Sequence, residues 1–223
     1  MAKSDNGKDV KKSKTQTLTI PAPNFQVATF TIVGTAPLVG NKFSARARAE
    51  MRQKMEEGPT AKKGKKREAK DFDRGYREAT HRSAEGWAGI PAPAFRNAMI
   101  SACRVVGFAM TRAKLSIFVF EDGFDEDDGT PLVRITKGEP KYAEHFVRNE
   151  SGVCDLRPRP MWEAGWEAKV RVRFDGDQFT MPDVANLMAR AGIQVGICAG
   201  RPDSAKSNGM GWGLFTIKDN GKS

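Results

Sequence analysis

The sequence predicts an α+β fold in one domain, and two kinds of periodicity carry that prediction. Residues 166–174 alternate strictly between apolar and charged side chains, as a half-buried strand does. Residues 91–106 and 180–191 instead repeat apolar side chains at every third or fourth position, the period of a helix packed on one side. The 223 residues suffice for one good-sized core, and 39% hydrophobic with 29% charged residues is ordinary for a soluble protein.

The N-terminal part of the domain is expected to be a strand followed by an insertion. Residues 25–33 are rich in β-forming residues and end at Gly34. From 41 to 85 the chain is charged and has few apolar residues to bury, so we expect a short helix over 45–57 and a mobile basic loop. We therefore divide the chain into a basic flexible tail, 1–20, and a single domain, 21–223, that carries the insertion 41–85.

The middle of the chain is expected to supply a helix and two strands. The helix over 91–106 would bury a stripe that includes Val105 and Val106 and would end at Gly107. Strands are expected over 114–120 and 132–135. The acidic loop between them, 121–129, lacks the carboxylate spacing of an EF-hand, so we interpret it as a solvated hairpin tip and expect no metal there.

The C-terminal part completes the predicted topology. Thr180 is placed to cap a helix that Gly192 would end, and strands are expected over 193–198 and 213–217. The order of strand, insertion, helix, strands, strand, helix and strand is a split βαβ plan. That plan predicts a ferredoxin-like arrangement, with both helices on one face of the sheet and the other face open to a ligand.

The distribution of charge indicates a polyanionic partner. The formal charge is +10, and residues 1–20 carry five Lys against two Asp, while residues 41–85 carry fourteen Lys and Arg against eight acids. The rest of the chain is nearly neutral. Positive charge on projecting segments suits a protein that grips a phosphate backbone. A lysine tail that serves only solubility is the alternative.

A glycine-rich segment near the C-terminus, 196–213, contains five glycines. Glycine permits positive φ and close approach, so successive backbone N–H groups can converge on phosphate oxygens, with Arg201 and Lys206 adding charge. Neither a P-loop nor a dinucleotide-binding fingerprint is present. Trp212 could stack on a base or fill the core, and a hairpin that only turns the chain is the alternative for the whole segment.

Two stretches of the chain resemble known families. The glycine-rich ending with the strand and helix before it, together with Gly89-Ile90-Pro91-Ala92-Pro93-Ala94-Phe95-Arg96 at the start of the first core helix, resembles the RAMP superfamily, which includes backbone and processing subunits of CRISPR surveillance complexes. This resemblance implies a ferredoxin-like, RRM-related fold with an inserted thumb. The pattern from 25 to 217 also resembles a family of phage- and prophage-encoded proteins, through residues 91–95 and 209–215.

Together these observations predict a sequence-tolerant single-stranded nucleic-acid-binding protein of phage type that is not an enzyme and needs no cofactor. The resemblance adds a homo-oligomer that coats RNA or DNA as a filament. The expected contacts to the strand are basic residues, glycines and one indole. They are Lys42, Arg46, Arg48, Arg52, Lys62, Lys63, Lys65, Lys66, Arg96, Arg104, Lys169, Arg171, Arg173, Arg201, Lys206, Gly209, Gly211 and Trp212.

Two other functions remain open at this point. One is a virion, assembly or protein-interaction component whose basic tail touches DNA. The other is a metal-independent RNA-processing endonuclease, which would need a histidine as its general base. The candidates are His81, in the charged insertion, and His145, expected in a loop, and neither has an evident partner.

The remaining observations concern the compartment. Cys103, Cys154 and Cys198 are widely spaced without a CxxC pair, so we expect reduced, buried thiols rather than disulfides or a zinc site. No apolar run approaches the ~20 residues of a membrane span, and the lysine-rich N-terminus is unlike a secretory signal. We expect the cytoplasm, that of a bacterial host if the protein is phage-encoded.

Overall fold

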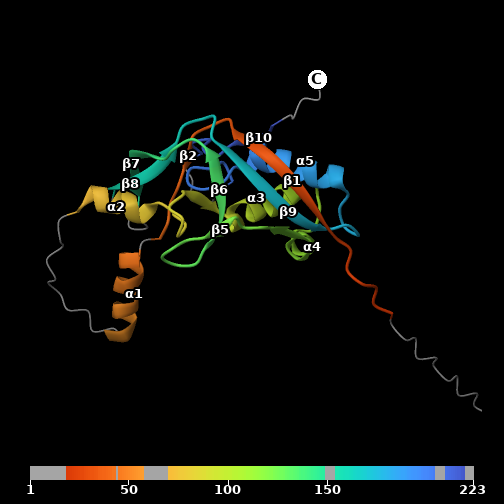
Figure 1. Cartoon of the computed structure of the whole chain (residues 1–223), viewed down its shortest axis with the longest axis horizontal. Coiled ribbons are helices and arrows are strands. Elements are labelled where there is room, and N and C mark those ends of the chain that lie inside the picture. Colours follow the sequence, from red (N-terminus) through yellow and green to blue (C-terminus); the bar gives the residue numbers. More distant parts are fainter. Residues whose placement is uncertain (1–18, 44, 58–69, 149–153, 204–208, 219–223) are drawn as a thin grey trace, which may run out of the picture.

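Two antiparallel sheets and a layer of helices make up the protein (Figure 1). The computed structural model describes residues 19–43, 45–57, 70–148, 154–203 and 209–218. This architecture confirms the predicted α+β class. The larger sheet has the order β10 (Phe215–Ile217), β1 (Phe25–Gly34), β9 (Glu167–Asp175), β6 (Pro131–Lys137), β3 (Gly89–Pro91), with β4 (Ile117–Val119) on β9 and β5 (Gly123–Phe124) on β6. The smaller sheet has the order β2 (Leu38–Val39), β8 (Cys154–Trp162), β7 (Lys141–Arg148).

The pairing of β1 with β9 forms the centre of the larger sheet. The two strands run side by side from the Phe25↔Asp175 pair to the Val33↔Glu167 pair (Figure 1). Because side chains alternate between the two faces of a strand, every second residue faces the helices, and beyond the exposed Gln26 these residues are buried. These residues are Ala28, Phe30 and Ile32 of β1 and Ala168, Val170, Val172 and Phe174 of β9. The strands predicted at 25–33 and 166–174 are confirmed.

Helices α3 (Ala92–Val105) and α5 (Met181–Arg190) cover that buried face. The predicted capping box at Thr180 is confirmed, since its hydroxyl accepts a hydrogen bond from the Asp183 N–H and the Asp183 carboxylate accepts one from the Thr180 N–H. The expected stripe of α3 is buried through Cys103, whereas Val105 and Val106 are exposed, because the helix ends there and the chain turns away at Gly107.

Gly192 does not end α5, and the predicted strand over 193–198 is wrong. The helix instead continues into a π-helical turn, η1 (Ala191–Val195), which ends at Gly196 with φ +72°. A side chain at position 192 would collide with the backbone of Phe215, so the glycine allows β10 to pack directly against the turn. The final strand is therefore shorter than predicted, beginning at Phe215.

The predicted strand over 114–120 is also wrong in its first half. Residues Met110–Ser116 form the short helix α4, and only Ile117–Val119 pair with β9. Arg96 explains this ending, because its guanidinium donates hydrogen bonds to the carbonyls of Lys114 and Ile117, where the helix stops. A helix C-terminus leaves such carbonyls without helical partners.

The smaller sheet and α2 (Phe72–Ala79) were not predicted. Residues 141–148 pair with 154–162 in a hairpin, and α2 packs on β8, where Gly75 lies against Pro158. Proline cannot donate to a ladder and argues against a strand interior. Here the Pro160 carbonyl points toward β2, where it accepts a hydrogen bond from the Gly40 N–H. The N and the carbonyl of a strand residue point to the same side, so the N–H groups that Pro158 and Pro160 lack would not have paired with β7. The two prolines are therefore tolerated in this strand.

The expected insertion is only partly a projection. Helix α1 (Ala45–Glu57) has the predicted bounds and stands away from the rest of the described chain, below α2 in Figure 1. The expected basic loop lies at 58–69, outside the described residues. The segment after α2 belongs to the folded body, because Thr80, His81 and Ser83 are buried.

In the part of the chain that the structure describes, no helix has both the length and the apolar character needed to cross a lipid bilayer. The expectation of three buried thiols is confirmed for Cys103 and met in part by Cys198, which is half-buried. It is wrong for Cys154, which is exposed at the start of β8.

The backbone at Gly213 provides a test of the packing between the glycine-rich segment and the body. Gly213 has φ +68°, donates its N–H to the Pro37 carbonyl, and approaches Ile197 so closely that a Cβ would collide with the Ile197 carbonyl. Gly211 also has positive φ, but nothing lies within 4 Å of its missing Cβ. We expect Gly213→Ala to lower the free energy of unfolding by about 3–5 kcal/mol and Gly211→Ala by only about 1 kcal/mol, measured by chemical denaturation.

Equal losses in these two variants would contradict the close packing at Gly213.

Candidate functional site

A cleft of about 960 Å³ opens where three parts of the fold meet. One wall is the exposed side of α3 and the residues before it, and the second is the β7–β8 hairpin. The third consists of residues 195–201 with Asp203, Met210 and Trp212. The volume lies within the usual range of ligand sites, about 300–1,000 Å³. The described residues of the glycine-rich segment therefore line a cavity.

Two arginines of β8 supply the positive charge of the hairpin wall. Arg157 and Arg159 are two residues apart, so they share one face of the strand, and His145 lies directly opposite Arg157 in the β7–β8 register. Arg159 is only 8% exposed. Its Nε has no hydrogen-bond partner, and within the described ranges no carboxylate lies at ion-pair distance from it.

The electrostatic state of Arg159 is unfavourable in the free protein. Its burial and then the neighbouring Arg157 both lower the pKa of its guanidinium below the ordinary value. A buried cation is normally paired with an anion, because leaving it uncompensated costs several kcal/mol. The hairpin wall thus holds a cation that the described part of the protein does not neutralise.

His145 and Trp212 meet across the cleft between the hairpin and the glycine-rich segment. Their ring centroids are 4.8 Å apart and their planes tilt by 56°. The His145 Nε2 is buried and has no partner, and burial followed by the charge of Arg159 lowers the pKa of this imidazole. His145 is therefore neutral at pH 7. The expectation that it lies in a loop is wrong, because it belongs to β7.

The third wall is held in shape by its own arginine. Arg201 donates to the carbonyls of Cys198 and Asp203, which fixes the turn on which it sits. Gly200 has φ +73°, and a Cβ there would collide with the Trp212 ring, so the glycine lets the indole lie against the backbone. Burial raises the pKa of the Cys198 thiol to about 12, so this cysteine is not a nucleophile at neutral pH.

Of the contacts predicted from the sequence, five lie at this cleft or beside it. Arg201 and Trp212 line it, and Gly209 and Gly211 flank Met210, which also lines it. Arg104, on α3, pairs with Asp203 at 2.6 Å at the edge of the cleft. Lys206 lies outside the described residues.

A second group of predicted contacts lies on the other side of the larger sheet. Lys169 and Arg171 are exposed on the face of β9 that points away from α3 and α5, and Arg173 is half-buried on the same face. Arg96 reaches the edge of that sheet at β4 through its bond to Ile117. The structure therefore does not bring this group together with the cleft.

The predicted contacts of the insertion are divided further. Arg48 pairs with Asp128 at 3.5 Å and Arg52 with Glu56 at 2.8 Å within α1. The side chain of Arg46 and the lysines of the loop lie outside the described part of the chain. These lysines are Lys62, Lys63, Lys65 and Lys66.

Lys42 is a buried structural cation rather than a surface contact. Its Nζ lies 2.6 Å from Oδ1 of Asp125 and 2.5 Å from an oxygen of Asp127, while His81 Nδ1 lies 2.8 Å from Oδ2 of Asp125. Asp125 is 3% exposed, so the interpretation of 121–129 as a solvated tip is wrong at this residue, whereas residues 126–129 are exposed as expected. Asp125 points inward because Lys42 and His81 together neutralise and hydrogen-bond its carboxylate.

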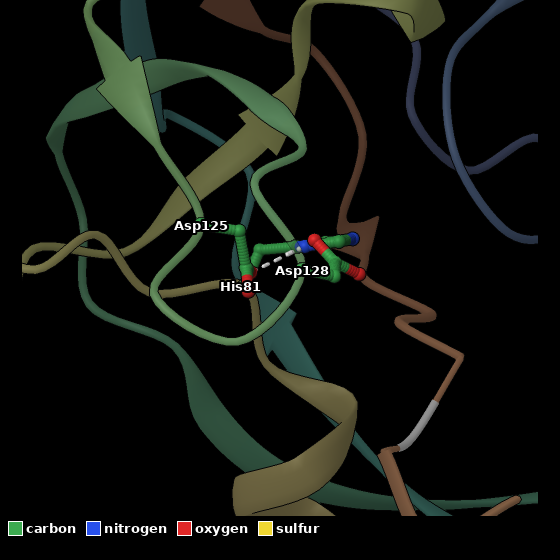
Figure 2. A group of neighbouring side chains, drawn as sticks. All are labelled: His81, Asp125 and Asp128. Carbon is green, nitrogen blue, oxygen red and sulfur yellow. Dashed lines mark hydrogen bonds and ion pairs between the residues drawn. The ribbon is translucent and has the colours of Figure 1, made fainter. Parts of the chain in front are cut away.

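The same cluster contains a set of possible metal ligands, shown in Figure 2. Ligand atoms of His81, Asp125 and Asp128 lie within 4.8 Å of one another. Both oxygens of Asp125 already accept hydrogen bonds, one from Lys42 and one shared with His81. The Lys42 ammonium thus supplies the positive charge that a cation would bring. We interpret this cluster as part of the fold.

Arg157 and Arg159 were missed because residues 139–165 contain no apolar alternation that indicates a strand. The signal was present in another form. The sequence Arg157-Pro158-Arg159-Pro160 places the arginines at every second position and the prolines between them, which is a period-2 pattern if the prolines are accepted in a strand.

Comparisons of the sequence with protein-family models and with curated proteins find no match. The resemblance to the RAMP superfamily and to phage-encoded proteins therefore stays a prediction.

The buried Lys42 pair yields a stability prediction. Replacing Lys42 with Met leaves Asp125 with only His81 and the Asp127 N–H as partners, so we expect the free energy of unfolding to fall by about 3 kcal/mol. The matched control is Lys137→Met, which removes an exposed pair with Glu167 and should cost less than about 1 kcal/mol. Chemical denaturation of both variants measures the difference, and a similar small loss in both would show that the buried pair is not structural.

The contribution of this pair should also depend on pH. Burial raises the pKa of Asp125, but hydrogen bonds from Lys42 and His81 outweigh it and hold the pKa below 3.8. Burial lowers the pKa of Lys42, but its bonds to Asp125 and Asp127 hold it above 10.5. The difference in free energy of unfolding between wild type and Lys42→Met should thus be largest between these two pKa values. It should disappear as acid protonates Asp125 or strong base deprotonates Lys42.

Proposed function

We propose that this protein binds single-stranded nucleic acid through backbone phosphates in the cleft, with little preference for sequence. The observation that carries the proposal is the buried Arg159, a cation without an anion in the described residues. A phosphate oxygen at this position would supply the missing negative charge. Arginine is well suited to the task, since its planar guanidinium can bind two phosphate oxygens at once.

The surroundings of Arg159 favour a polynucleotide over an isolated anion. Arg157, whose Nε lies 3.2 Å from a carboxylate oxygen of Asp155, adds a second guanidinium on the same wall, and Arg201 adds a third on the opposite side, so a strand finds more than one guanidinium along the cleft. Trp212 provides a ring at the cleft, and unpaired bases stack on such rings irrespective of sequence. Phosphate contacts position a strand without reading it, which accounts for tolerance of sequence.

The arrangement of the larger sheet supports a ferredoxin-like core for this function. The order β10-β1-β9-β6, with α3 following β1 and α5 following β9, is the order expected of a split βαβ plan. On this basis we retain the RAMP-like, phage-type protein as our proposal, acting in the cytoplasm. Assembly along a long strand belongs to the same proposal, and electron microscopy with and without the strand tests it.

RNA cleavage is a second candidate, and His145 is the observation that favours it. Its neutral imidazole lies in the cleft with Nε2 unpartnered, next to two guanidinium groups. Such a group can accept the proton of a ribose 2′-hydroxyl while the arginines stabilise charge on the phosphate. Incubating labelled RNA with wild-type protein and with His145→Gln tests it. Cleavage that the substitution abolishes supports the nuclease, and intact RNA with retained binding supports the binder.

The central test of the binding proposal is Arg159→Met. We expect affinity for a fluorescent oligothymidylate to fall about 10- to 100-fold, because a charge-assisted hydrogen bond is lost. The slope of log affinity against log salt should become shallower by about 0.7, the value for one phosphate of a single strand. The free energy of unfolding should stay unchanged or rise, since an uncompensated buried charge is removed. Fluorescence anisotropy and chemical denaturation measure these quantities.

Arg190→Met is the matched control, because Arg190 is exposed on α5 and does not line the cleft. It should change neither affinity nor stability noticeably. An Arg159→Met protein that is destabilised but binds as the wild type does would make Arg159 a structural residue and refute the proposal.

Binding should depend on pH through His145. Its pKa is lowered below 6.5 in the free protein, and a phosphate beside the ring would favour the charged imidazolium and raise the pKa in the complex. Affinity should therefore increase as pH falls through the pKa of the complex and level off below the pKa of the free protein. Titrations of wild type and His145→Gln between about pH 5 and 8 measure this, and the variant should lose the dependence. An identical pH profile in both would place His145 away from the bound phosphate.

A further inference from the structure

The outer face of the larger sheet carries phenylalanine rings interleaved with arginines. The outer-face cluster consists of Phe25 on β1, Phe118 on β4, Phe120 just after it, and Arg171 and Arg173 on β9. The guanidinium carbon of Arg173 lies 4.9 Å from the Phe25 ring centre, 4.8 Å from that of Phe118 and 5.9 Å from that of Phe120. Arg171 lies 5.7 Å from the Phe120 ring.

This cluster lies outside the hydrophobic core. It is on the face of β1 and β9 opposite to α3 and α5, and Phe25 is 41% exposed, with Val27 beside it 53% exposed. Arg173 Nε is buried without a hydrogen-bond partner, and among the described residues no carboxylate forms an ion pair with Arg173. Core packing therefore does not explain why rings and guanidinium groups gather here.

The charges around the cluster favour an anionic partner. Lys169 and Arg171 continue the face along β9, opposite Thr31 and Thr29 of β1. Two carboxylates end the same row: Asp175, opposite Phe25, and Glu167, which is paired with Lys218 and Lys137, and these hydrogen bonds lower its pKa. Arg171 is paired with Asp122 at 3.3 Å, whereas Lys169 and Arg173 have no carboxylate at ion-pair distance among the described residues. The cations of β9 thus outweigh its acids on this side.

We propose that the outer-face cluster is a stacking surface for unpaired nucleobases, separate from the phosphate-binding cleft. The exposed Phe25 ring would stack on a base, and the guanidinium of Arg173 would hold the ring plane from below, as arginines do against aromatic faces. Lys169 would attract the adjoining phosphates. This inference shares with the proposed function only the ligand, a single strand of nucleic acid. It does not depend on any residue of the cleft.

The test compares Phe25→Leu with wild type on two probes. One probe is an oligothymidylate, and the other is a strand of the same length made of abasic nucleotides, which has phosphates but no bases. Loss of one stacked base should lower the affinity for oligothymidylate about 10-fold and leave that for the abasic strand unchanged. Phe43→Leu is the matched control, since Phe43 is also an exposed phenylalanine, 55% accessible, in the segment before α1.

Three outcomes would overturn the inference. Unchanged affinity of Phe25→Leu for oligothymidylate means that no base stacks there. Equal weakening for both probes means that the ring acts through the fold and not through a base. A change in the oligomeric state without any strand, seen by light scattering, means that the face docks a second copy of the chain.

The proposals for the cleft and for the outer face can be refuted independently. Arg159→Met is measured on the same probes, and it should weaken binding of both, because it acts on phosphates. If Arg159→Met binds normally while Phe25→Leu is selectively weak on oligothymidylate, the cleft proposal fails and the stacking surface stands. Ultraviolet crosslinking of the wild type to oligothymidylate checks the surface without any substitution. Adducts on Phe25 or Phe118 are expected, and adducts confined to other peptides would refute the proposal.

Discussion

The pairing of β1 with β9 is the constraint on which the rest of the structure depends. Nine residues of each strand are in register, and the alternation of their side chains creates two faces of different character. One face is apolar from Ala28 to Ile32 of β1 and from Ala168 to Phe174 of β9 and receives α3 and α5. The other carries lysine, arginine and phenylalanine. A slip of one residue would exchange the two faces, so burial of one face fixes the chemistry of the other.

The cleft follows from how the smaller sheet is attached to this framework. Trp166, at the start of β9, donates to the Ala36 carbonyl and packs on Phe215, while Gly34 leaves space for its indole. The chain from Gly34 therefore turns at once into β2, which pairs with the end of β8. This places the arginine-bearing face of the hairpin opposite α3 and the glycine-rich segment. The charge of the cleft comes mainly from one strand and its shape from the other two walls.

Much of the fold could be predicted from the sequence wherever one periodicity dominated. The strands β1 and β9, the helices α1, α3 and α5 and the capping box at Thr180 all have strong local signals, and all were confirmed. The hairpin, α2, α4 and the π-turn could not be predicted, because prolines, short length or a tertiary contact such as that of Gly192 with Phe215 decide their structure. Local propensity is weak where packing sets the outcome.

Prediction of the candidate site from the sequence failed for a different reason, the burial of charged side chains. Arg201 and Trp212 were predicted because glycine-rich segments are recognisable in a sequence. A lysine in a charged stretch is instead expected to be exposed, but Lys42 is the buried partner of Asp125. The two residues of that pair are 83 positions apart, and nothing near Lys42 in the sequence predicts it. Conversely, Arg159 has an ordinary sequence context and an unusual environment. Burial of a charge is a property of the whole fold.

The unneutralised arginine has an evolutionary consequence. Ala143 of β7 lies directly opposite Arg159, on the same face of the hairpin. An aspartate at position 143 would place a carboxylate next to the guanidinium, stabilise the free protein and compete with any incoming anion. A single such change would convert an open site into one that inhibits itself. Under the proposed function, stability of the free protein and anion binding in the cleft therefore make opposite demands on the side chain at this position.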